Sequence, residues 1–533
     1  MRPSGTSQLE IIYPTCRAFL DSDTWNTLVA EYTAKKNARS FEILLTQRIR
    51  EPGLPEFLPG LARLESAIAE APQRGQAIPV DVDRREINPT LSLIETSWKG
   101  LPSLIDARDG LLRDPPKRGE EQILVWYHPK NETVQYRSAT NEDLLVLKMI
   151  AESIDPRVVA KEGTVPIGAV QGAIDRAVEN GLILEPRSLI RRDRGASPAW
   201  QDIDEQFLES SFFTIQWHIT QVCDLHCRHC YDRSDRSPLT LEAGIAILDD
   251  LVAFCANRHV RGQVSFSGGN PLLYPHFFDL YRAASERGFV TAILGNPAPR
   301  EQLEQIVEIQ KPSHYQVSLE GLEKYNDYIR GYGNYRNVMT FLPLLHDLGI
   351  EAHIMLTLTR DNIDQVLPLA EILRNKADSF TFNRLSQVGE GAQLAIPSRD
   401  EYRAFLIDYV EAAKANPVMT LKDNLTNIIL HQRGEKLFGG CAGYGCSAAF
   451  NFIAILPDGE AHACRKFPSY IGNVLHQSIG EIYDSEAARR YRAGTQTQEC
   501  QSCSIRPVCG GCLAVMFGQG LDIFEDLDPH CFM

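Results

Sequence analysis

The feature that most constrains the fold is a regular alternation of strand-like and helix-like runs between residues 213 and 386. Six runs are rich in β-branched and aromatic residues, at 213–220, 263–269, 290–296, 314–321, 351–359 and 379–386. Amphipathic runs, for example 276–288 and 335–349, separate them. Strand–helix units in series predict an α/β protein whose parallel sheet curves into a partial (β/α)6 barrel. In such a sheet, reactive groups collect on the loops that follow the carboxyl ends of the strands.

Three cysteines lie in the loop that follows the first of these strands. The stretch QVCDLHCRHC places Cys223, Cys227 and Cys230 in a C-x3-C-x2-C pattern. A structural zinc site needs four ligands, so His226 or His229 would have to complete it. A [4Fe–4S] cluster on three cysteines instead leaves one iron open to a substrate or cofactor. The motif by itself favours iron only slightly, and the zinc alternative stays open.

The overall composition disfavours several classes of function. The formal net charge of −15 repels a nucleic-acid backbone, so general nucleic-acid binding is not expected. No run of about eighteen apolar residues is present, so no membrane span is expected. The N-terminus lacks the apolar segment of a secretory signal, and the thirteen cysteines are therefore expected as reduced thiols or metal ligands. These features predict a cytoplasmic protein.

The remaining segments suggest six parts along the chain. A hairpin over 123–137 precedes two helical runs, 141–154 and 168–183, which is the outline of a winged helix. In this outline Asn141 caps the first helix and Gly181 supplies the left-handed turn after the second. The parts are a helical N-terminal region of unknown role (1–118), the winged helix (119–190), a linker (191–212), the barrel (213–395), a helical connector (396–440) and a cysteine-rich C-terminal domain (441–533).

The cysteine loop together with the six βα units resembles the radical S-adenosylmethionine (SAM) superfamily. The resemblance implies that Cys223, Cys227 and Cys230 hold a [4Fe–4S] cluster whose open iron chelates the amino and carboxylate groups of SAM. Reductive cleavage of SAM then yields a 5′-deoxyadenosyl radical, with an electron donor such as flavodoxin or ferredoxin as a partner. His229 stands where the family usually has an aromatic residue, and it is expected to shield the cluster.

Two shorter motifs fit the same resemblance, although glycines and a serine that simply end strands are the alternative. Gly268, Gly269, Asn270 and Pro271 stand where the family has a GGEP-type motif for the methionine amino group. Glycines permit a close approach of the backbone. Asn270 replaces the usual acid, so its amide oxygen can accept a hydrogen bond but carries no charge. Ser318 matches the position that bonds the SAM ribose in many relatives.

The C-terminal cysteines resemble the SPASM extension, which carries two auxiliary [4Fe–4S] clusters. The resemblance assigns one cluster to Cys441, Cys446, Cys464 and Cys512 and the other to Cys500, Cys503, Cys509 and Cys531, and so implies three clusters in the chain. A zinc ribbon over 500–512 is the alternative. Arg465 stands where sulfatase-maturing relatives have an acidic base, which disfavours that reaction.

The winged-helix outline at 119–190 resembles the recognition element of enzymes that modify ribosomally made peptides (RiPPs). That module binds the leader of a precursor peptide as an added strand. A DNA-binding winged helix is the alternative, which the low Lys and Arg content disfavours. The motifs together imply a peptide maturase, for which thioether cross-linking of a cysteine or selenocysteine is the expected reaction, and the long N-terminal region resembles that of the maturases of selenobiotic-type peptides. Epimerisation, carbon–carbon cross-linking, activation of a protein partner and a zinc-stabilised binding protein remain as alternatives.

Overall fold

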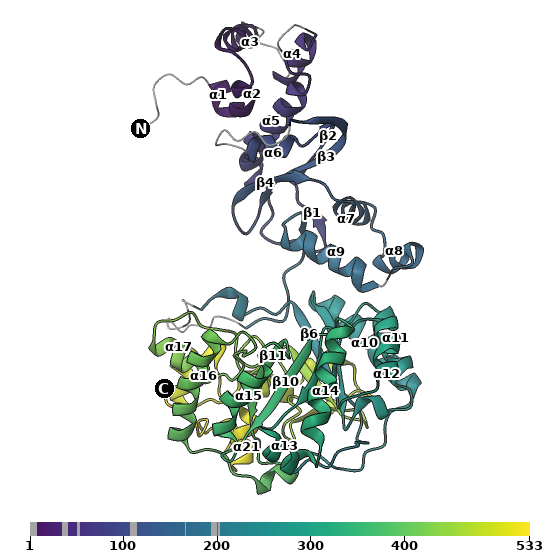
Figure 1. Cartoon of the computed structure of the whole chain (residues 1–533), viewed down its shortest axis with the longest axis vertical. Coiled ribbons are helices and arrows are strands. Elements are labelled where there is room, and N and C mark those ends of the chain that lie inside the picture. The colour runs from purple at the N-terminus through teal and green to yellow at the C-terminus, as the bar shows by residue number, and fades with distance from the viewer. Residues whose placement is uncertain are drawn as a thin grey trace. The chain divides into compact units, whose positions relative to one another are not determined.

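The computed structural model describes residues 8–34, 41–50, 54–106, 115–165, 167–192, 200 and 203–533 (Figure 1). The chain forms two compact units, one of residues 1–165 and 169–187 and the other of 166–168 and 188–533. The predicted linker at 191–212 contains residues 193–199 and 201–202, which lie outside the described residues. No helix of the described residues is long and apolar enough to cross a membrane.

The second unit is built on a nine-stranded sheet. Six of its strands are parallel and lie side by side in chain order: β6 (Phe212–Thr220), β7 (Arg261–Gly268), β8 (Val290–Leu294), β9 (Tyr315–Ser318), β10 (Ala352–Leu358) and β11 (Ser379–Arg384). They coincide with the six predicted runs. The (β/α)6 series is therefore confirmed.

Helices connect the parallel strands and cover one face of the sheet. They are α10 (Leu241–Arg258), α11 (Phe277–Glu286), α12 (Arg300–Ile309), α13 (Glu323–Arg330), α14 (Asn334–Asp347) and α15 (Val366–Leu373). Figure 1 shows α14 and α15 lying over β10 and β11. Cys255, at the end of α10, is buried in the core, as its helical spacing predicts.

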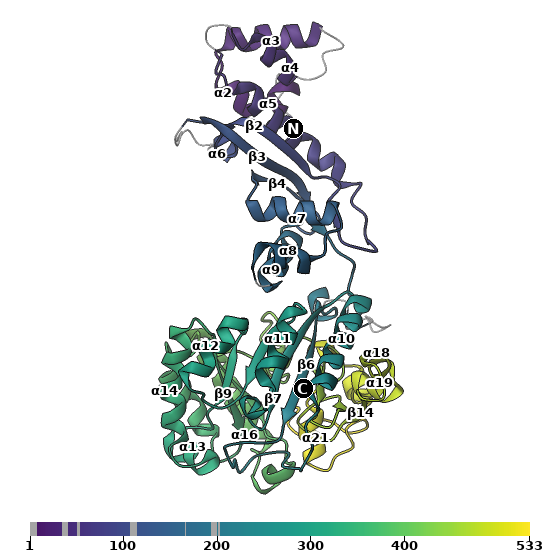
Figure 2. The ribbon, with the colours of Figure 1, turned by 90° about the vertical axis from the view of Figure 1, so that its right-hand side faces the viewer.

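The sheet continues beyond β6 into the cysteine-rich C-terminal segment. Strand β12 (Phe452–Ile455) pairs in parallel with β6, and β13 (Glu460–His462) and β14 (Tyr470–Asn473) follow in antiparallel order. Figure 2 shows this segment, in yellow, beside β6. Within the described residues the sheet thus has two edges, β11 and β14, and is open. Helices α16 (Arg399–Ala415) and α17 (Thr426–Gln432) occupy the predicted helical connector.

Side chains of the parallel strands alternate between the two faces of the sheet, as the period of two requires. In β6, Ile215 and Trp217 are buried in the core, whereas Thr214 and Gln216 line a cavity on the opposite face. Burying each large apolar side chain stabilises the fold by roughly 1.5–3 kcal/mol. The alternation in β7 and β9 likewise brings polar side chains to the cavity face: Gln263, Ser265, Gln316 and Ser318. The helices therefore cover the apolar face and leave, on the other, a cavity with polar side chains in its wall.

The first unit combines helices with a three-stranded antiparallel sheet, in the order β2 (Ser92–Lys99), β3 (Lys117–His128), β4 (Thr133–Ser138). Its described helices are α1 (Gln8–Ile12), α2 (Pro14–Ala18), α3 (Ser22–Ala34), α4 (Phe41–Arg48), α5 (Leu58–Gly75), α6 (Leu101–Asp106), α7 (Asn141–Ala151), α8 (Pro156–Gly163) and α9 (Ile167–Glu179). Short strands β1 (Glu86–Ile87) and β5 (Ile183–Leu184) pair with each other. The N-terminal helices and the sheet share one apolar core.

Two details of the first unit differ from the sequence predictions. Strand β2 lies in the region predicted as helical, and its signal is weak because Ile94 is its one fully buried residue. Helix α7 is capped by Thr140 and not by Asn141. The Thr140 hydroxyl accepts from the Asp143 amide, and the Asp143 carboxylate accepts from the Thr140 amide. Gly181 has a φ of +70°, the left-handed turn that the sequence predicts.

Candidate functional site

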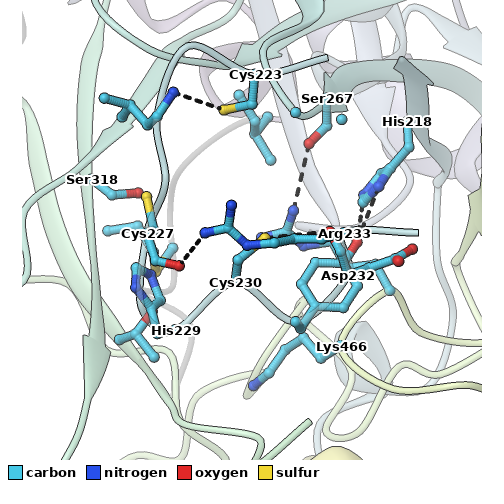
Figure 3. Close-up of a pocket in the computed structure, with 18 of the residues that line it drawn as sticks. His218, Cys223, Cys227, His229, Cys230, Asp232, Arg233, Ser267, Ser318 and Lys466 are labelled. Carbon is cyan, nitrogen blue, oxygen red and sulfur yellow. Dashed lines mark hydrogen bonds between the residues drawn. The ribbon is translucent and has the colours of Figure 1, made fainter. Parts of the chain in front are cut away.

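The loop after β6, residues 221–234 (the three-cysteine loop), meets the ends of the parallel strands. Cys223, Cys227 and Cys230 line one cavity of about 480 Å³, the strand-end cavity, together with Gly268, Gly269, Ser318 and His229 (Figure 3). The predicted residues are therefore brought together, except Asn270 and Pro271, which are buried beside the cavity and do not line it.

The two glycines bring the loop after β7 against the three-cysteine loop. The Gly269 amide donates to the Thr220 carbonyl at 2.8 Å, and the Asn270 amide donates to the Val222 carbonyl at 2.8 Å. A Cβ on Gly268 would lie 2.2 Å from the Thr220 oxygen, and a Cβ on Gly269 would lie 2.2 Å from the Val222 oxygen. Gly268 also has a φ of +139°. A side chain at either glycine would push the cysteines away from the strand ends.

A buried ion pair lies next to Cys227. Arg330 donates to Cys227 Sγ at 3.8 Å, and its Nη2 lies 2.7 Å from Glu320 Oε1. Burial would raise the pKa of Glu320, but His229 and Arg330 hold it down, to about 2. The Thr357 amide donates to the second carboxylate oxygen at 2.7 Å. Glu320 is therefore ionised, and it fixes a cation beside the thiol.

His229 has one satisfied and one unsatisfied ring nitrogen. Its Nε2 lies 3.3 Å from Glu320 Oε1, whereas its buried Nδ1 has no hydrogen-bond partner among the described residues. The sequence analysis assigned no role to Glu320 or Arg330. Glu320 comes two residues after Ser318, a predicted site residue, and Arg330 is the last residue of α13. Only the packing of β9 and α13 against the loop reveals their contact with Cys227.

Amide groups surround the residue after Cys223. Asn296 Nδ2 lies 3.7 Å from Cys223 Sγ and donates to Asp224 Oδ1 at 2.6 Å. Asn270 Nδ2 donates to the same oxygen at 3.1 Å. The Asn270 oxygen, which the sequence analysis expected to serve as an acceptor for SAM, accepts from the Leu272 amide at 3.3 Å.

The other side of the strand-end cavity carries a histidine, a tyrosine and an arginine. The Tyr231 hydroxyl lies 3.0 Å from His218 Nδ1. Burial and the nearby Arg465 lower the pKa of His218 to about 3, so the imidazole is neutral. Arg465 donates to Ser267 Oγ at 3.5 Å, and its guanidinium lies 5.8 Å from the centre of the Tyr231 ring. Arg465 thus faces the cavity where an acid would stand in a sulfatase-maturing enzyme.

Four C-terminal cysteines come together in a second site. Cys441, Cys446, Cys464 and Cys512 line one small cavity, the four-cysteine cavity. Burial raises the pKa of Cys446 to about 12 and that of Cys464 to about 11. Lys466, also in the wall, lies 4.0 Å from Cys512 Sγ through its Nζ. This cation stabilises negative charge on the sulfur atoms.

The remaining four cysteines gather near the C-terminus of the chain. Burial raises the pKa of Cys500, Cys503 and Cys509, and in each case the neighbouring Cys531 raises it further. The Cys446 amide donates to the Cys509 carbonyl at 2.8 Å, which joins this set to the four-cysteine cavity. Cys500, Cys503, Cys509 and Cys531 thus lie near one another, and the assignment of each set of four cysteines to one cluster stays a prediction.

A further cavity of about 500 Å³, the interior cavity, adjoins the strand-end cavity and the four-cysteine cavity. It shares six lining residues with the strand-end cavity, Leu294, Gln316, Met355, Asn383, Arg465 and Lys466, and Cys441 and Cys464 also line it. In the described part of the chain, no three His, Cys, Asp or Glu side chains are arranged to ligate a single metal ion. Thiols spread around a cavity suit a cluster, which binds each cysteine at a different iron. The unsatisfied Nδ1 of His229 also fits a polar group in the strand-end cavity.

Comparison with known proteins agrees with this chemistry. Residues 217–373 match the radical SAM superfamily, and residues 446–504 match SPASM, an iron–sulfur cluster-binding domain. Mycofactocin maturase MftC of Mycolicibacterium smegmatis is 28% identical over 339 residues, which are 60% of this chain and 82% of that protein. The AdoMet-dependent heme synthase of Methanosarcina barkeri is 24% identical over 60% of this chain and 95% of its own length.

One further relative is named for the biosynthesis of a bacteriocin, and one similar solved structure contains a precursor peptide. The subtilosin biosynthesis protein AlbA of Bacillus subtilis is 24% identical over 56% of this chain and 66% of its own length. The crystal structure of Streptococcus suis SuiB bound to precursor peptide SuiA superposes with a TM-score of 0.50 at 19% identity, covering 77% of this chain and 96% of that one. This likeness shows the fold. The chain therefore carries a radical SAM domain at residues 217–373 and a SPASM domain at residues 446–504, the domains of a radical SAM enzyme that uses SAM and iron–sulfur clusters.

Proposed function

We propose that this enzyme modifies a ribosomally made precursor peptide and forms a thioether cross-link in it. The observation that carries the proposal is the interior cavity, which shares lining residues with the strand-end cavity and with the four-cysteine cavity and has several hydrogen-bonding side chains in its wall, among them Gln263, Gln316 and Asn383. A peptide segment needs such walls, because its backbone groups must keep hydrogen-bond partners when they leave water. The names of MftC, AlbA and the SuiB–SuiA complex support a peptide as the substrate.

The proposed cofactors are SAM and three [4Fe–4S] clusters, one on the three-cysteine loop and one on each C-terminal set of four. SAM, when bound and reduced, supplies a 5′-deoxyadenosyl radical that abstracts hydrogen. Gly268, Gly269, Ser318 and His229 are the proposed SAM contacts, with Asn270 and Pro271 supporting them from behind the cavity wall. A flavodoxin or ferredoxin is the proposed electron donor.

The first unit offers a place for the leader of the peptide. Strand β4 pairs with β3 and forms an edge of its sheet. The Ala139 amide donates to the Gln122 carbonyl, so the alternation of an antiparallel ladder turns the N–H groups of Val134 and Tyr136 away from β3. An extended leader would add to this edge as a fourth strand.

Reaction of the anaerobically reconstituted enzyme with SAM, dithionite and a short precursor peptide encoded beside its gene tests the function. A thioether lowers the peptide mass by two hydrogens and protects one cysteine from alkylation. A two-hydrogen loss with every thiol still reactive would indicate a carbon–carbon bond instead. A mass that is unchanged in H2O but rises by about one unit in D2O, with the deuterium on an α-carbon, would indicate epimerisation. Cleavage of SAM without any change in the peptide would contradict the proposal.

A proline substitution tests the leader site separately. Val134→Pro removes an outward N–H and leaves the β3–β4 ladder intact, because that N–H does not bond β3. We expect weaker binding of the leader, measured by fluorescence anisotropy of a labelled leader peptide, and unchanged SAM cleavage. Val134→Ala is the matched control and should bind as the native chain does. Equal binding by both variants would exclude this edge.

A further inference from the structure

The interior cavity has positive side chains in its wall but no carboxylate to balance them. Lys422, Arg465 and Lys466 line it, and no Asp or Glu is among the described residues that do so. The wall also contains neutral hydrogen-bonding groups, such as the amides of Gln316 and Asn383. A charge that is taken out of water needs a partner of opposite charge. Each of the three cations therefore needs an anionic partner, either inside the protein or in a ligand.

Lys466 is engaged with the C-terminal cysteines. Its Nζ lies 4.0 Å from Cys512 Sγ and donates to a backbone carbonyl at 3.2 Å. Arg465 and Lys422 lack a comparable partner. Within the described residues Arg465 makes a single hydrogen bond, from Nη1 to Ser267 Oγ at 3.5 Å, and Lys422 makes no hydrogen bond or ion pair. Two of the three cations are therefore available to a ligand.

The cations of the interior cavity lie close enough to repel one another. Burial lowers the pKa of Lys422, an effect that the Cys441 thiol partly offsets. The charges of Lys466 and Arg465 lower this pKa further. A carboxylate bound by Lys422 and Arg465 would relieve that repulsion, and a planar guanidinium can bind it through two parallel hydrogen bonds.

In the proposed function a peptide segment enters this cavity, so the substrate can supply the carboxylate. We propose that Lys422 and Arg465 bind a carboxylate of the precursor peptide in the interior cavity and thereby select the segment that is modified. The carboxylate belongs to an Asp or Glu side chain or to the C-terminus of the peptide. The inference rests on the proposed function for the identity of the ligand, whereas the charge of the cavity is independent of that function.

Three capped tripeptides test the site without the precursor. Acetyl-Gly-Asp-Gly-amide carries a side-chain carboxylate, acetyl-Gly-Asn-Gly with a free C-terminus carries a terminal carboxylate, and acetyl-Gly-Asn-Gly-amide carries neither. Equilibrium dialysis of the radiolabelled tripeptides measures their binding to the reconstituted enzyme. We expect one of the charged tripeptides to bind about 10-fold more tightly than the neutral one, the gain of a charge-assisted hydrogen bond, and that tripeptide identifies the source of the carboxylate. Equal binding of all three would overturn the proposal.

Variants of the two cations attribute the preference to the cavity. Lys422→Met keeps the unbranched stem and removes the charge, so it should lose the preference, whereas Lys422→Arg should keep it. Lys436→Met, at an exposed lysine, is the matched control and should bind the three tripeptides as the native enzyme does. If Lys422→Met fails to load its iron, Arg465→Met is the second variant and should lose the preference in the same way. A preference that survives in either iron-loaded variant, or failure of both variants to bind iron, would overturn the proposal, because the cations would then serve the cluster.

The precursor peptide separates this inference from the proposed function. Replacing each Asp and Glu of the precursor by Asn or Gln in turn, and amidating its C-terminus, should in one case raise KM about 10-fold at unchanged kcat. The same change should leave KM unaltered in Lys422→Met. Modification of the precursor without such a dependence would overturn the carboxylate site and leave the function standing. A tripeptide preference without any modification of the precursor would support the site and contradict the function.

Discussion

The three-cysteine loop and the four-cysteine cavity lie in the same unit, but the chain builds them in opposite ways. The loop takes all its thiols from residues 223–230, at the rim of the sheet. The cavity takes its thiols from residues between 441 and 512, and exists only when β12, β13 and the C-terminal segment have packed together. The three thiols of the loop therefore come together within one short segment, whereas the four thiols of the cavity come together only when distant segments have folded.

The largest expected effect separates the chemistry of the two regions. Cys227→Ala removes one of three thiols from a site without a spare ligand, so formation of 5′-deoxyadenosine should fall to background. Cys446→Ala should retain SAM cleavage and lose peptide modification, because its thiol faces the other cavity. Iron content should fall by about four per chain in each variant. Chromatography of the nucleoside and mass spectrometry of the peptide measure the two activities.

Cys255→Ala is the control for both variants. Its thiol lies in the helical core and faces neither cavity, so iron content and both activities should stay at native values. If Cys446→Ala bound SAM normally but no longer cleaved it, SAM cleavage at the three-cysteine loop would depend on the four-cysteine cavity. Stoichiometric zinc in place of iron in the native enzyme would contradict the cluster assignment altogether.

The next effect concerns the fold around the C-terminal cysteines. Arg384 is buried between Asp423 and Asp528, with nitrogen–oxygen distances of 2.8 Å, and Asp528 also accepts from the Cys512 amide. Arg384→Met leaves two buried carboxylates without a cation and should lower the free energy of unfolding by about 3–5 kcal/mol. Urea unfolding followed by circular dichroism measures it.

Arg330→Met provides the comparison at the three-cysteine loop. It leaves Glu320 with His229 and the Thr357 amide, so the loss of stability should be smaller than for Arg384→Met. A larger loss for Arg330→Met would reverse the comparison, because the loop would then be the region on which the fold depends.

The same contrast explains what the sequence could predict. The six parallel strands were predicted from local composition, and their pairing in the sheet confirms them. The cysteine motifs are read directly from the spacing of the cysteines. Arg330 reaches Cys227 from a helix about a hundred residues away and is paired there with Glu320 from a strand end, and no local pattern encodes these contacts. The role of Asn270 was predicted from its acceptor oxygen, but packing directs its donor group to Asp224. Strand β2 escaped prediction because the helices of the first unit cover it mainly at Ile94.

A smaller effect is the acid sensitivity of the strand-end cavity. His218 has a pKa near 3 in the folded chain, well below its usual value of about 6.5. The unfolded chain therefore binds the proton first, so this contribution is complete above about pH 6.5 and is lost as the pH falls toward 3. At pH 5 the loss should be about 2 kcal/mol. The unfolding free energy of the native enzyme and of His218→Asn at pH 7.5 and pH 5 measures it.

His218→Asn cannot titrate, so the difference between the two pH values should be about 2 kcal/mol smaller in this variant than in the native enzyme. His276→Asn is the control, because this histidine is exposed to solvent. It should keep the native difference in unfolding free energy between the two pH values. An equal pH dependence for the native enzyme and His218→Asn would mean that the imidazole accepts a proton in the folded state, and that burial and Arg465 do not hold it neutral.

The smallest expected effect measures how far the two regions are coupled. Arg236 lies two residues after the three-cysteine loop, and its Nη1 is 2.8 Å from Oε2 of Glu460. Glu460 belongs to β13, in the hairpin that precedes Cys464. Because both side chains are partly exposed, Arg236→Met should cost only about 0.5–1 kcal/mol. A double-mutant cycle with Glu460→Gln should give a coupling energy of the same size. The control cycle combines Glu460→Gln with Arg282→Met, on the exposed side of α11, and its coupling energy should not exceed about 0.3 kcal/mol. A coupling energy of zero for Arg236 would mean that this surface ion pair does not stabilise the contact between the loop and the hairpin. The β6–β12 ladder alone would then hold the two regions together.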